Sequence, residues 1–293
     1  MPAERLARRA EISRDCFTLA AISVTIEAAP METRLITLTT DFGYKDPFVG
    51  IMKGVIAGID PDALVVDISH GIPPQDLMAG ALILQHSVSY FPRGTIHVAV
   101  VDPGVGGSRR PLLIQCDGNY FIGPDNGVLS LALEGKTPTG IIHLSNPAFY
   151  LQPTSATFHG RDIFAPAAAH LSRGVAANLL GEPVGDFVRL QWPEALPTAD
   201  KIDGKIIYVD SFGNLFTNIR DRDLQGLPND KIVISLGNQI VEGVASNYAA
   251  VAGEKLLAVI NSWGLLEIAC YKGSAQRRTG AKIGDIVHLH IAS

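Results

Sequence analysis

Four consecutive residues within the segment TFHGRD, residues 157–162, bring together an imidazole, a glycine, a guanidinium and a carboxylate. A short polar residue before an apolar helical run often starts a helix. One interpretation is therefore that Asp162 caps a helix over DIFAPAAAHL, while Arg161 is solvated or salt-bridged. The other is that His159, whose ring titrates near neutral pH, takes part in catalysis. The segment alone leaves both interpretations open.

The segment VDPGVGGSRR, residues 101–110, places an aspartate and two arginines on either side of a glycine-rich turn. Its glycines allow positive φ angles and a close approach of the backbone to a ligand. The GxGxxG order of a dinucleotide fingerprint and the Lys-Ser/Thr pair of a P-loop are both missing, so we exclude these two classes. What remains is an acid, Asp102, and a cation, Arg109, that could face each other across the turn.

Polar residues follow the ends of several predicted strands, namely Asp41, Asp67, His70, Asp102 and the pair Asp125-Asn126. A single aspartate at such a position is usually a turn or cap residue, but four positions on one edge of a sheet predict a polar pocket. The histidines His70, His97 and His159 share no ligand spacing, so the sequence predicts no metal site.

Short β-branched runs alternate with longer amphipathic runs from residue 35 onward. Buried strands are predicted at LITLTT (35–40), LVVDI (64–68), TIHVAVV (95–101) and GIIHL (140–144), and helices at FVGIMKGVIAGI (48–59) and DLMAGALILQHSVSYF (76–91). Asp117-Gly118 predicts a tight hairpin turn between LLIQC and NYFIG. This alternation predicts the α/β class, with helices on both faces of a mostly parallel sheet.

Helical periodicity fades after about residue 188. Short strands separated by Gly, Asn and Asp turns follow, which predicts a small C-terminal β-barrel. We therefore expect an N-terminal extension (1–33), an α/β domain (34–188), a linker (189–200) and a β-barrel domain (201–293). The extension is expected to be disordered or a non-native start, because Met31 stands just before the first convincing strand.

The composition is that of an ordinary globular protein of 293 residues, 47% of them hydrophobic. A net charge of −5 with no extended basic run argues against nucleic acid as a partner. Three isolated cysteines fit neither a disulfide framework nor a CxxC metal site, and favour the reducing cytoplasm. No apolar run reaches the length of a membrane span, and the first thirty residues imitate a signal peptide only weakly.

Six motifs occur in order: TTDFG (39–43), VDPGVG (101–106), PDNG (124–127), TFHGRD (157–162), DSFGN (210–214) and NSWGLLEIA (261–269). Together they closely resemble the S-adenosylmethionine hydroxide adenosyltransferases, which are relatives of the enzymes that attach fluoride or chloride to the same molecule. The resemblance covers residues 35–291. It implies an α/β domain followed by a small β-barrel. It also implies a reaction in which water displaces methionine from the 5′ carbon of S-adenosylmethionine, giving adenosine and L-methionine.

The resemblance implies a catalytic set of Asp102, Arg109 and His159. Their chemistry fits the reaction, because the sulfonium leaves as a neutral thioether and the difficulty lies in activating water. The set offers an anion, a fixed cation and a titratable ring for that task. S-adenosylmethionine is then the substrate, and we expect neither a cofactor nor a metal. The resemblance also implies a homotrimer, in which the α/β domain of one subunit and the β-domain of the next share a site.

Substrate-binding roles carry over from the resemblance position by position. Asp41 matches the carboxylate that accepts both ribose hydroxyls, and Asp210 matches the group near the methionine ammonium. Asn214 matches the amide that hydrogen-bonds adenine, and Ser262 matches the hydroxyl near the methionine carboxylate.

Two further assignments are weaker. Phe158 packs either on the ligand or in the core, and Asp46 resembles an additional acidic position near the amino-acid end. The halogenating relatives differ from this chain, since they have Tyr at the positions of Asp102 and His159, and the fluoride-transferring ones have Ser at Gly160. A carboxylate at Asp102 would repel a halide and hold water, so the sequence favours hydroxide.

Other functions remain as alternatives. A non-catalytic sensor of S-adenosylmethionine or nucleosides would keep Asp41 and Asn214 but would not need the catalytic set. A halogenase would use the same substrate with a halide. A metal-dependent phosphohydrolase built on the acidic edge would be inhibited by EDTA and would not release adenosine from S-adenosylmethionine.

Overall fold

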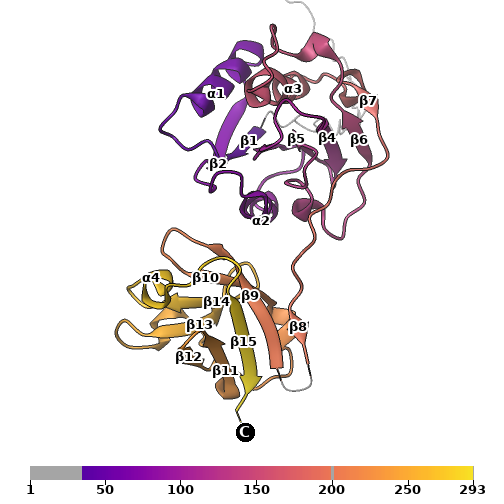
Figure 1. Ribbon diagram of the computed structural model, residues 1–293. Helices are drawn as coiled ribbons and strands as arrows, with labels where there is room; N and C mark the ends of the chain where they lie inside the picture. Colours follow the sequence, from indigo (N-terminus) through magenta and orange to yellow (C-terminus); the bar gives the residue numbers. More distant parts are fainter. Residues whose placement is uncertain (1–34, 199–200, 293) are drawn as a thin grey trace, which may run out of the picture. The chain divides into compact units, whose positions relative to one another are not determined.

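The structure of the protein, a computed structural model, describes residues 35–198 and 201–292. The predicted N-terminal extension at 1–33 lies outside the described residues. Within the described ranges, the strands form one mixed sheet and one antiparallel sheet (Figure 1).

The first sheet has the strand order β2-β1-β3-β5-β4-β6-β7. Its strands are β1 (Leu35–Thr40), β2 (Leu64–Ser69), β3 (Ile96–Val100), β4 (Pro111–Cys116), β5 (Asn119–Pro124), β6 (Gly140–His143) and β7 (Glu182–Pro183). The pairs β1–β2, β1–β3 and β3–β5 are parallel, and the pairs involving β4, β6 and β7 are antiparallel. The carboxyl ends of the parallel strands therefore share one edge, as predicted.

Helices cover both faces of this sheet, which Figure 1 shows with α1 and α3 on one side and α2 on the other. The helices are α1 (Phe48–Ile59), α2 (Leu77–Val88) and α3 (Ala165–Ser172). In α1 the buried residues Val49, Met52 and Ile56 recur at helical spacing, and Met52 and Ile56 share a core cluster with residues of β1 and β3. Asp76 begins α2, because its side chain accepts a hydrogen bond from Ala79 N–H at 2.9 Å.

Two details of this part refine the predictions. The Asp117-Gly118 turn is confirmed, with both residues at positive φ (52° and 75°) between β4 and β5. A strand is present at the predicted position 64–68, but the prediction that it is buried is wrong. It is β2, an edge strand of the sheet, and its Leu64 is 63% exposed.

The second sheet is antiparallel throughout and has the order β12-β11-β15-β9-β10-β14-β13, with β8 also paired to β9. Its strands are β8 (Leu196–Pro197), β9 (Lys201–Val209), β10 (Leu215–Arg220), β11 (Ile232–Leu236), β12 (Gln239–Glu242), β13 (Leu256–Ile260), β14 (Leu265–Cys270) and β15 (Ile286–Ile291). Beyond β12, Ala245 donates from its N–H to Ala258 O of β13 at 2.8 Å. This contact brings the two ends of the sheet together, so the sheet is nearly closed and barrel-like.

One short helix, α4 (Ala275–Thr279), was not predicted by the sequence. Short 3₁₀ turns complete the secondary structure at Leu131–Leu133, Pro147–Phe149, Ala177–Leu179, Asp221–Leu224, Asn229–Lys231 and Tyr248–Ala250. The predicted fold class, a mostly parallel α/β sheet followed by a small β-barrel, is confirmed.

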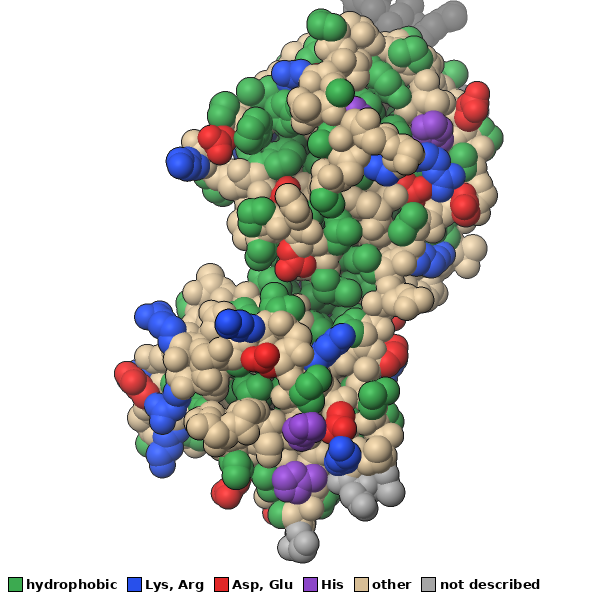
Figure 2. All heavy atoms as spheres, viewed as in Figure 1, with side chains coloured by type: hydrophobic (Ala, Val, Ile, Leu, Met, Phe, Trp, Pro, Cys, Tyr) green, Lys and Arg blue, Asp and Glu red, His purple; other side chains and the backbone are tan. Residues whose placement is uncertain are grey.

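The surface and the helices bear on two predictions about partners. On the face shown in Figure 2, acidic and basic side chains are interspersed without an extended basic surface. Over residues 35–198 and 201–292, no helix combines the length and the apolar character needed to cross a membrane.

Candidate active site

Asp102, Arg109 and His159 form one continuous hydrogen-bonded chain. Arg109 Nε donates to Oδ1 of Asp102 at 3.0 Å, and Arg109 Nη2 donates to Oδ2 at 2.5 Å. The same Nη2 lies 2.7 Å from Nδ1 of His159. The side chains of Asp102 and Arg109 are only 5% and 9% exposed, so the ion pair is bidentate and shielded from bulk water.

The geometry fixes the tautomer of His159. A guanidinium can only donate, so Nδ1 of His159 must accept the hydrogen bond from Arg109. The proton of the neutral ring then lies on Nε2. Burial, followed by the positive charge of Arg109, lowers the pKa of His159 below its ordinary value of 6.5, although Asp102 and Asp162 act in the opposite direction. His159 is therefore a neutral donor at physiological pH.

Two loops must meet for this chain to form. Asp102 and Arg109 lie on the loop after β3, and that loop packs tightly on the segment before His159. A Cβ built on Gly106 would lie 2.1 Å from the backbone oxygen of Ala156, and Gly106 has a φ of +74°. Only glycine fits both the conformation and the contact, so this residue lets the two motifs approach each other.

The prediction that Asp162 caps a helix is wrong. The chain passes through a π-helical turn at Gly160–Phe164 and continues into α3, so Asp162 lies inside the helical segment rather than at its start. The predicted salt bridge is present: Arg161 Nε lies 2.6 Å from Oδ1 of the fully buried Asp162. Asp162 Oδ2 also accepts from Ser155 N–H at 2.8 Å. Asp162 thus anchors the loop that precedes His159.

A small pocket of about 190 Å³ opens beside the chain. It is lined by Phe42, Phe48, Val100, Asp102, Val105, Thr157, Phe158, His159 and Gly160. The rings of Phe42, Phe48 and Phe158 contact one another edge to face, with centroids 5.3 to 5.9 Å apart. The pocket therefore has a largely apolar wall and three polar side chains that can bind water, Asp102, Thr157 and His159.

Most residues of the predicted polar edge do not reach this pocket. Asp125 is paired with Arg110 at 2.5 Å and accepts from Val188 N–H at 2.7 Å, and Asn126 donates from Nδ2 to Val101 O at 2.8 Å, so both hold the backbone. Asp41 lies at the end of β1 next to Phe42, and its Oδ2 accepts from the backbone N–H of Gln75 at 2.8 Å. Of the predicted edge residues, Asp102 alone lines the 190 Å³ pocket.

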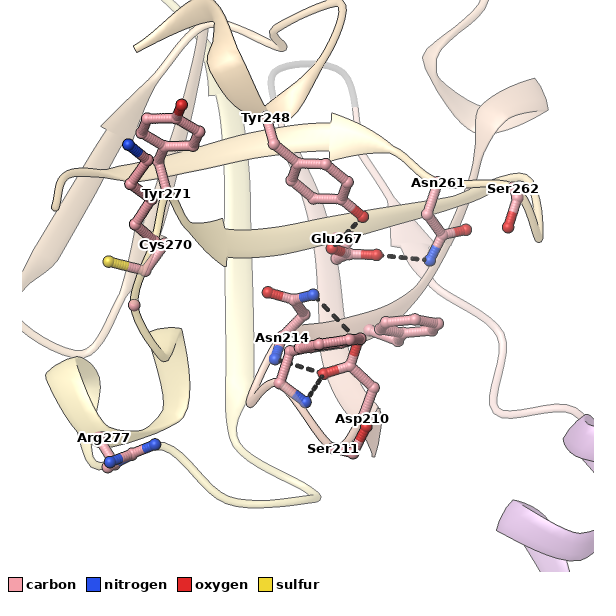
Figure 3. A pocket seen from close by; sticks show the side chains of 14 residues that line it. Asp210, Ser211, Asn214, Tyr248, Asn261, Ser262, Glu267, Cys270, Tyr271 and Arg277 are labelled. Atoms are coloured by element: carbon pink, nitrogen blue, oxygen red, sulfur yellow. Dashed lines mark hydrogen bonds between the residues drawn. The ribbon is translucent and has the colours of Figure 1, made fainter. Parts of the chain in front are cut away.

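A second, more open pocket of about 640 Å³ lies in the barrel part and gathers three of the predicted substrate residues, Asp210, Asn214 and Ser262 (Figure 3). Asp210 is strongly tied to its own turn. Its Oδ1 accepts from the backbone N–H groups of Phe212 and Asn214, and its Oδ2 accepts from Nδ2 of Asn214 at 2.9 Å. These bonds orient the amide of Asn214 toward Asp210.

The sequence analysis missed a buried acid in this pocket. Glu267 is 1% exposed, and its two oxygens accept from Tyr248 Oη at 2.8 Å and Asn261 Nδ2 at 3.0 Å (Figure 3). Burial raises the pKa of Glu267 and outweighs the lowering effect of these two hydrogen bonds. A single acid inside the apolar strand LLEIAC was the available signal, because unpaired acids are rarely buried in a strand.

The predicted site residues that line a pocket are divided between two pockets with no lining residue in common. Phe158 and the catalytic set lie at the first pocket, while Asp210, Asn214 and Ser262 line the second. Asp46 is exposed and lines neither of these two pockets. Among the residues that the structure describes, no three His, Cys, Asp or Glu side chains are grouped so as to hold a metal ion.

Comparison with known proteins identifies the family. The SAM hydroxide adenosyltransferase N-terminal domain matches residues 36–181, and the C-terminal domain of the same family matches residues 204–288. An (R)-S-adenosyl-L-methionine hydrolase from Salinispora arenicola is 37% identical over 259 residues, which cover 86% of this chain and 96% of the relative. A fluorinase from Nocardia brasiliensis is 26% identical over 291 residues, 88% of this chain and 97% of the relative.

Similarity to a solved structure extends over the same region. The crystal structure of an uncharacterized conserved protein from Thermotoga maritima matches with a TM-score of 0.81 and 34% identity, covering 87% of this chain and 99% of that one. The two sheets, the order of the motifs and the sequence identity all lead to one assignment. The chain belongs to the SAM hydroxide adenosyltransferase family.

Proposed function

We propose that the protein hydrolyses S-adenosylmethionine at the 5′ carbon and releases adenosine and L-methionine. The observation that carries this proposal is the Asp102–Arg109–His159 chain beside a small, mostly apolar pocket. Relatives 33 to 37% identical to the chain carry the name (R)-S-adenosyl-L-methionine hydrolase.

The difficult part of this reaction is the activation of the nucleophile, water. Water forms a bond to the 5′ carbon while the bond from that carbon to the sulfonium breaks, and sulfur keeps the electron pair as a neutral thioether. No acid is needed at the leaving group, and one proton is released from water. The site must therefore hold water, accept its proton and stabilise hydroxide.

The tautomer of His159 assigns different tasks to the three residues. Nε2–H of His159 is a donor toward the oxygen of a bound water, because Nδ1 is already occupied by Arg109. Asp102 keeps lone pairs that can accept from the same water, and Arg109 holds both groups in place. The apolar walls limit solvation of hydroxide and sulfonium, so less solvation is lost as the two charges merge.

The second pocket is suited to the rest of the substrate. We assign Asp210 to the methionine ammonium, Asn214 to adenine and Ser262 to the methionine carboxylate, and all three line this pocket. Asp41 is assigned to the ribose hydroxyls, Phe158 to packing on the ligand, and Asp46 to a lesser role near the amino-acid end.

The names of the relatives also specify a configuration at sulfur. They are called hydrolases of the (R) form, so we infer that this chain prefers the (R) epimer at the sulfonium. Incubating the protein with each purified epimer and measuring adenosine release tests this preference. Equal rates for the two epimers would contradict it.

We further infer a head-to-tail homotrimer. The two pockets share no lining residue, which supports this idea, since a neighbouring subunit could bring the second half of a site to the first. A cytoplasmic location is also proposed, because Cys116 and Cys270 are both unpaired. Analytical ultracentrifugation and cell fractionation test these two proposals.

The decisive experiment is chromatography of S-adenosylmethionine incubated with the pure protein in EDTA and without halide. Adenosine and methionine in equal amounts are expected, with one proton released per turnover. Binding without products would indicate a sensor. Product formed only with chloride or fluoride would indicate a halogenase, and loss of activity in EDTA would favour a metal-dependent hydrolase.

A further inference from the structure

A polar chain runs from α1 to the end of β1, beside the TTDFG loop, and it is buried at its Thr40 and His70 end. Nζ of Lys53 lies 2.6 Å from Oδ2 of Asp67, and Oδ1 of Asp67 lies 3.1 Å from Nε2 of His70. Nδ1 of His70 lies 2.8 Å from Oγ1 of Thr40. Oγ1 of Thr40 in turn accepts from the backbone N–H of Phe42 at 3.2 Å.

The hydrogen bonds of this chain have one consistent direction. The N–H of Phe42 can only donate, so the hydroxyl hydrogen of Thr40 is free to point at Nδ1 of His70. Nε2 of His70 lies 3.1 Å from Oδ1 of Asp67 and makes no well-aligned hydrogen bond within the described residues. Thr40 and His70 are 0% and 1% exposed, so water cannot readily replace a lost partner.

This chain fixes the loop that carries Asp41. On the far side of the loop, the N–H of Gly43 donates to the backbone oxygen of His70 at 2.8 Å. The loop is thus held at Phe42 and at Gly43, immediately after Asp41, while the side chain of Asp41 accepts from Gln75 N–H. Neither Thr40 nor His70 lines the pocket beside Asp102.

We propose that Thr40 and His70 are positioning residues that preset the carboxylate of Asp41 for the ribose hydroxyls of the substrate. This inference rests on the proposed function, in which Asp41 accepts the ribose diol. A loop that is already ordered before binding loses less conformational entropy when the ligand arrives. Removing the network should therefore weaken substrate binding more than the chemical step.

The test compares three substitutions on β1. Thr40→Val removes the hydroxyl at nearly constant volume, and Thr40→Ser restores it. Thr39→Val is the matched control, because Thr39 is also fully buried and its hydroxyl has no hydrogen-bond partner among the described residues. For adenosine release, Thr40→Val should raise KM about tenfold with kcat within about threefold, whereas both other variants should stay within about twofold of wild type.

A double-mutant cycle with Asp41→Ala shows whether the effect passes through Asp41. In that background Thr40→Val should add no further increase in KM, because the carboxylate that it positions is already gone. The proposal is overturned if Thr40→Val and Thr39→Val behave alike, or if Thr40→Val raises KM equally with and without Asp41. A wild-type protein that releases no adenosine overturns the proposed function itself, and this inference with it.

A second pair of variants covers the case in which Thr40→Val does not fold. His70→Asn places an amide near the position of Nδ1 and can keep the contact with Thr40, whereas His70→Gln places it near Nε2 and loses that contact. Only the Gln variant should raise KM about tenfold. An equal KM in the two His70 variants would overturn the assignment.

Discussion

Arg109 and His159, fifty positions apart in sequence, are joined by a contact of 2.7 Å between Nη2 and Nδ1. The contact exists only while Nδ1 of His159 is unprotonated, because a protonated ring would set one donor against another. It thus links the protonation state of the histidine to the geometry of the Asp102–Arg109 ion pair.

The first prediction concerns the pH dependence of activity. The pKa of His159 lies below 6.5, owing first to burial and then to Arg109. The pH must therefore fall below 6.5 before most of the rings take up a proton. We expect kcat/KM to decline in acid, with a midpoint below pH 6.5. A profile of kcat/KM against pH checks this expectation, and an acid midpoint above 6.5 would contradict the assigned tautomer.

Replacing Asp102 by Ala should impair the chemical step. The change removes the acceptor for the proton of water but leaves the proposed substrate residues intact, so kcat should fall on the order of 10² to 10⁴ with little change in KM. The control is Asp125→Ala, which removes an equally buried aspartate from a second Asp–Arg pair outside the pocket and should lower Tm without a comparable loss of kcat. Turnover within about threefold of wild type would remove Asp102 from the mechanism.

The close approach of two loops at Gly106 gives a third prediction. Gly106→Ala places a Cβ against the backbone of Ala156 and should separate the loop of Asp102 from that of His159, lowering both Tm and kcat. Gly135→Ala is the matched control, since Gly135 has a similar φ of +72° but nothing within 4 Å of its Cβ position. That control should cost only about 1 kcal/mol of stability and no activity. Equal effects of the two substitutions would show that the loop contact is unimportant.

Local patterns predicted the elements well. The strand at 35–40 and the helix at 48–59 have the predicted bounds. Both were predicted from the hydrophobic pattern of residues that are close together in sequence, and this pattern does not depend on distant contacts. The π-helical turn at 160–164 was not predictable in the same way. Within this turn Asp162 is bonded to Arg161 and Ser155, and these contacts take the place of the helix cap that a polar residue before an apolar run predicts.

The site was predictable to a different degree. Motif resemblance identified Asp102, Arg109 and His159, and the structure joins them. It did not identify Glu267, whose burial depends on Tyr248, a residue 19 positions away outside every motif. Nor did the edge of the sheet form one polar pocket, because neighbouring side chains such as Arg110 pair with its acids instead.

Buried histidines give a prediction about stability in acid. Burial, with a smaller effect of Lys136, lowers the pKa of His97 to about 4, whereas an unfolded chain would take up the proton near 6.5. The unfolded state therefore binds more protons between these values, and the free energy of unfolding should fall as pH drops from 6.5 to about 4. His97 accounts for about 3 kcal/mol of this fall in the free energy of unfolding, because each unit of pKa shift corresponds to about 1.4 kcal/mol.

Denaturant unfolding at several pH values measures this share. His97→Gln should flatten the decline in stability, and replacing the exposed His290 by Gln is the control. A decline of the same steepness in wild type and His97→Gln would contradict the prediction. His86, whose pKa is also lowered to about 4 by burial and then by Arg220, should account for part of the decline that remains.

The last prediction tests whether two subunits share a site. Asp102→Ala damages the α/β half and Asn214→Ala damages the barrel half, so each protein should be nearly inactive alone. After the two are unfolded together and refolded as an equal mixture, about a quarter of head-to-tail sites would combine two intact halves and regain activity. A mixture of Asp102→Ala with His159→Ala is the control, because both lesions lie in the same half and no intact site can form. If every site is built within one chain, the first mixture also stays inactive, and the head-to-tail trimer loses its functional basis.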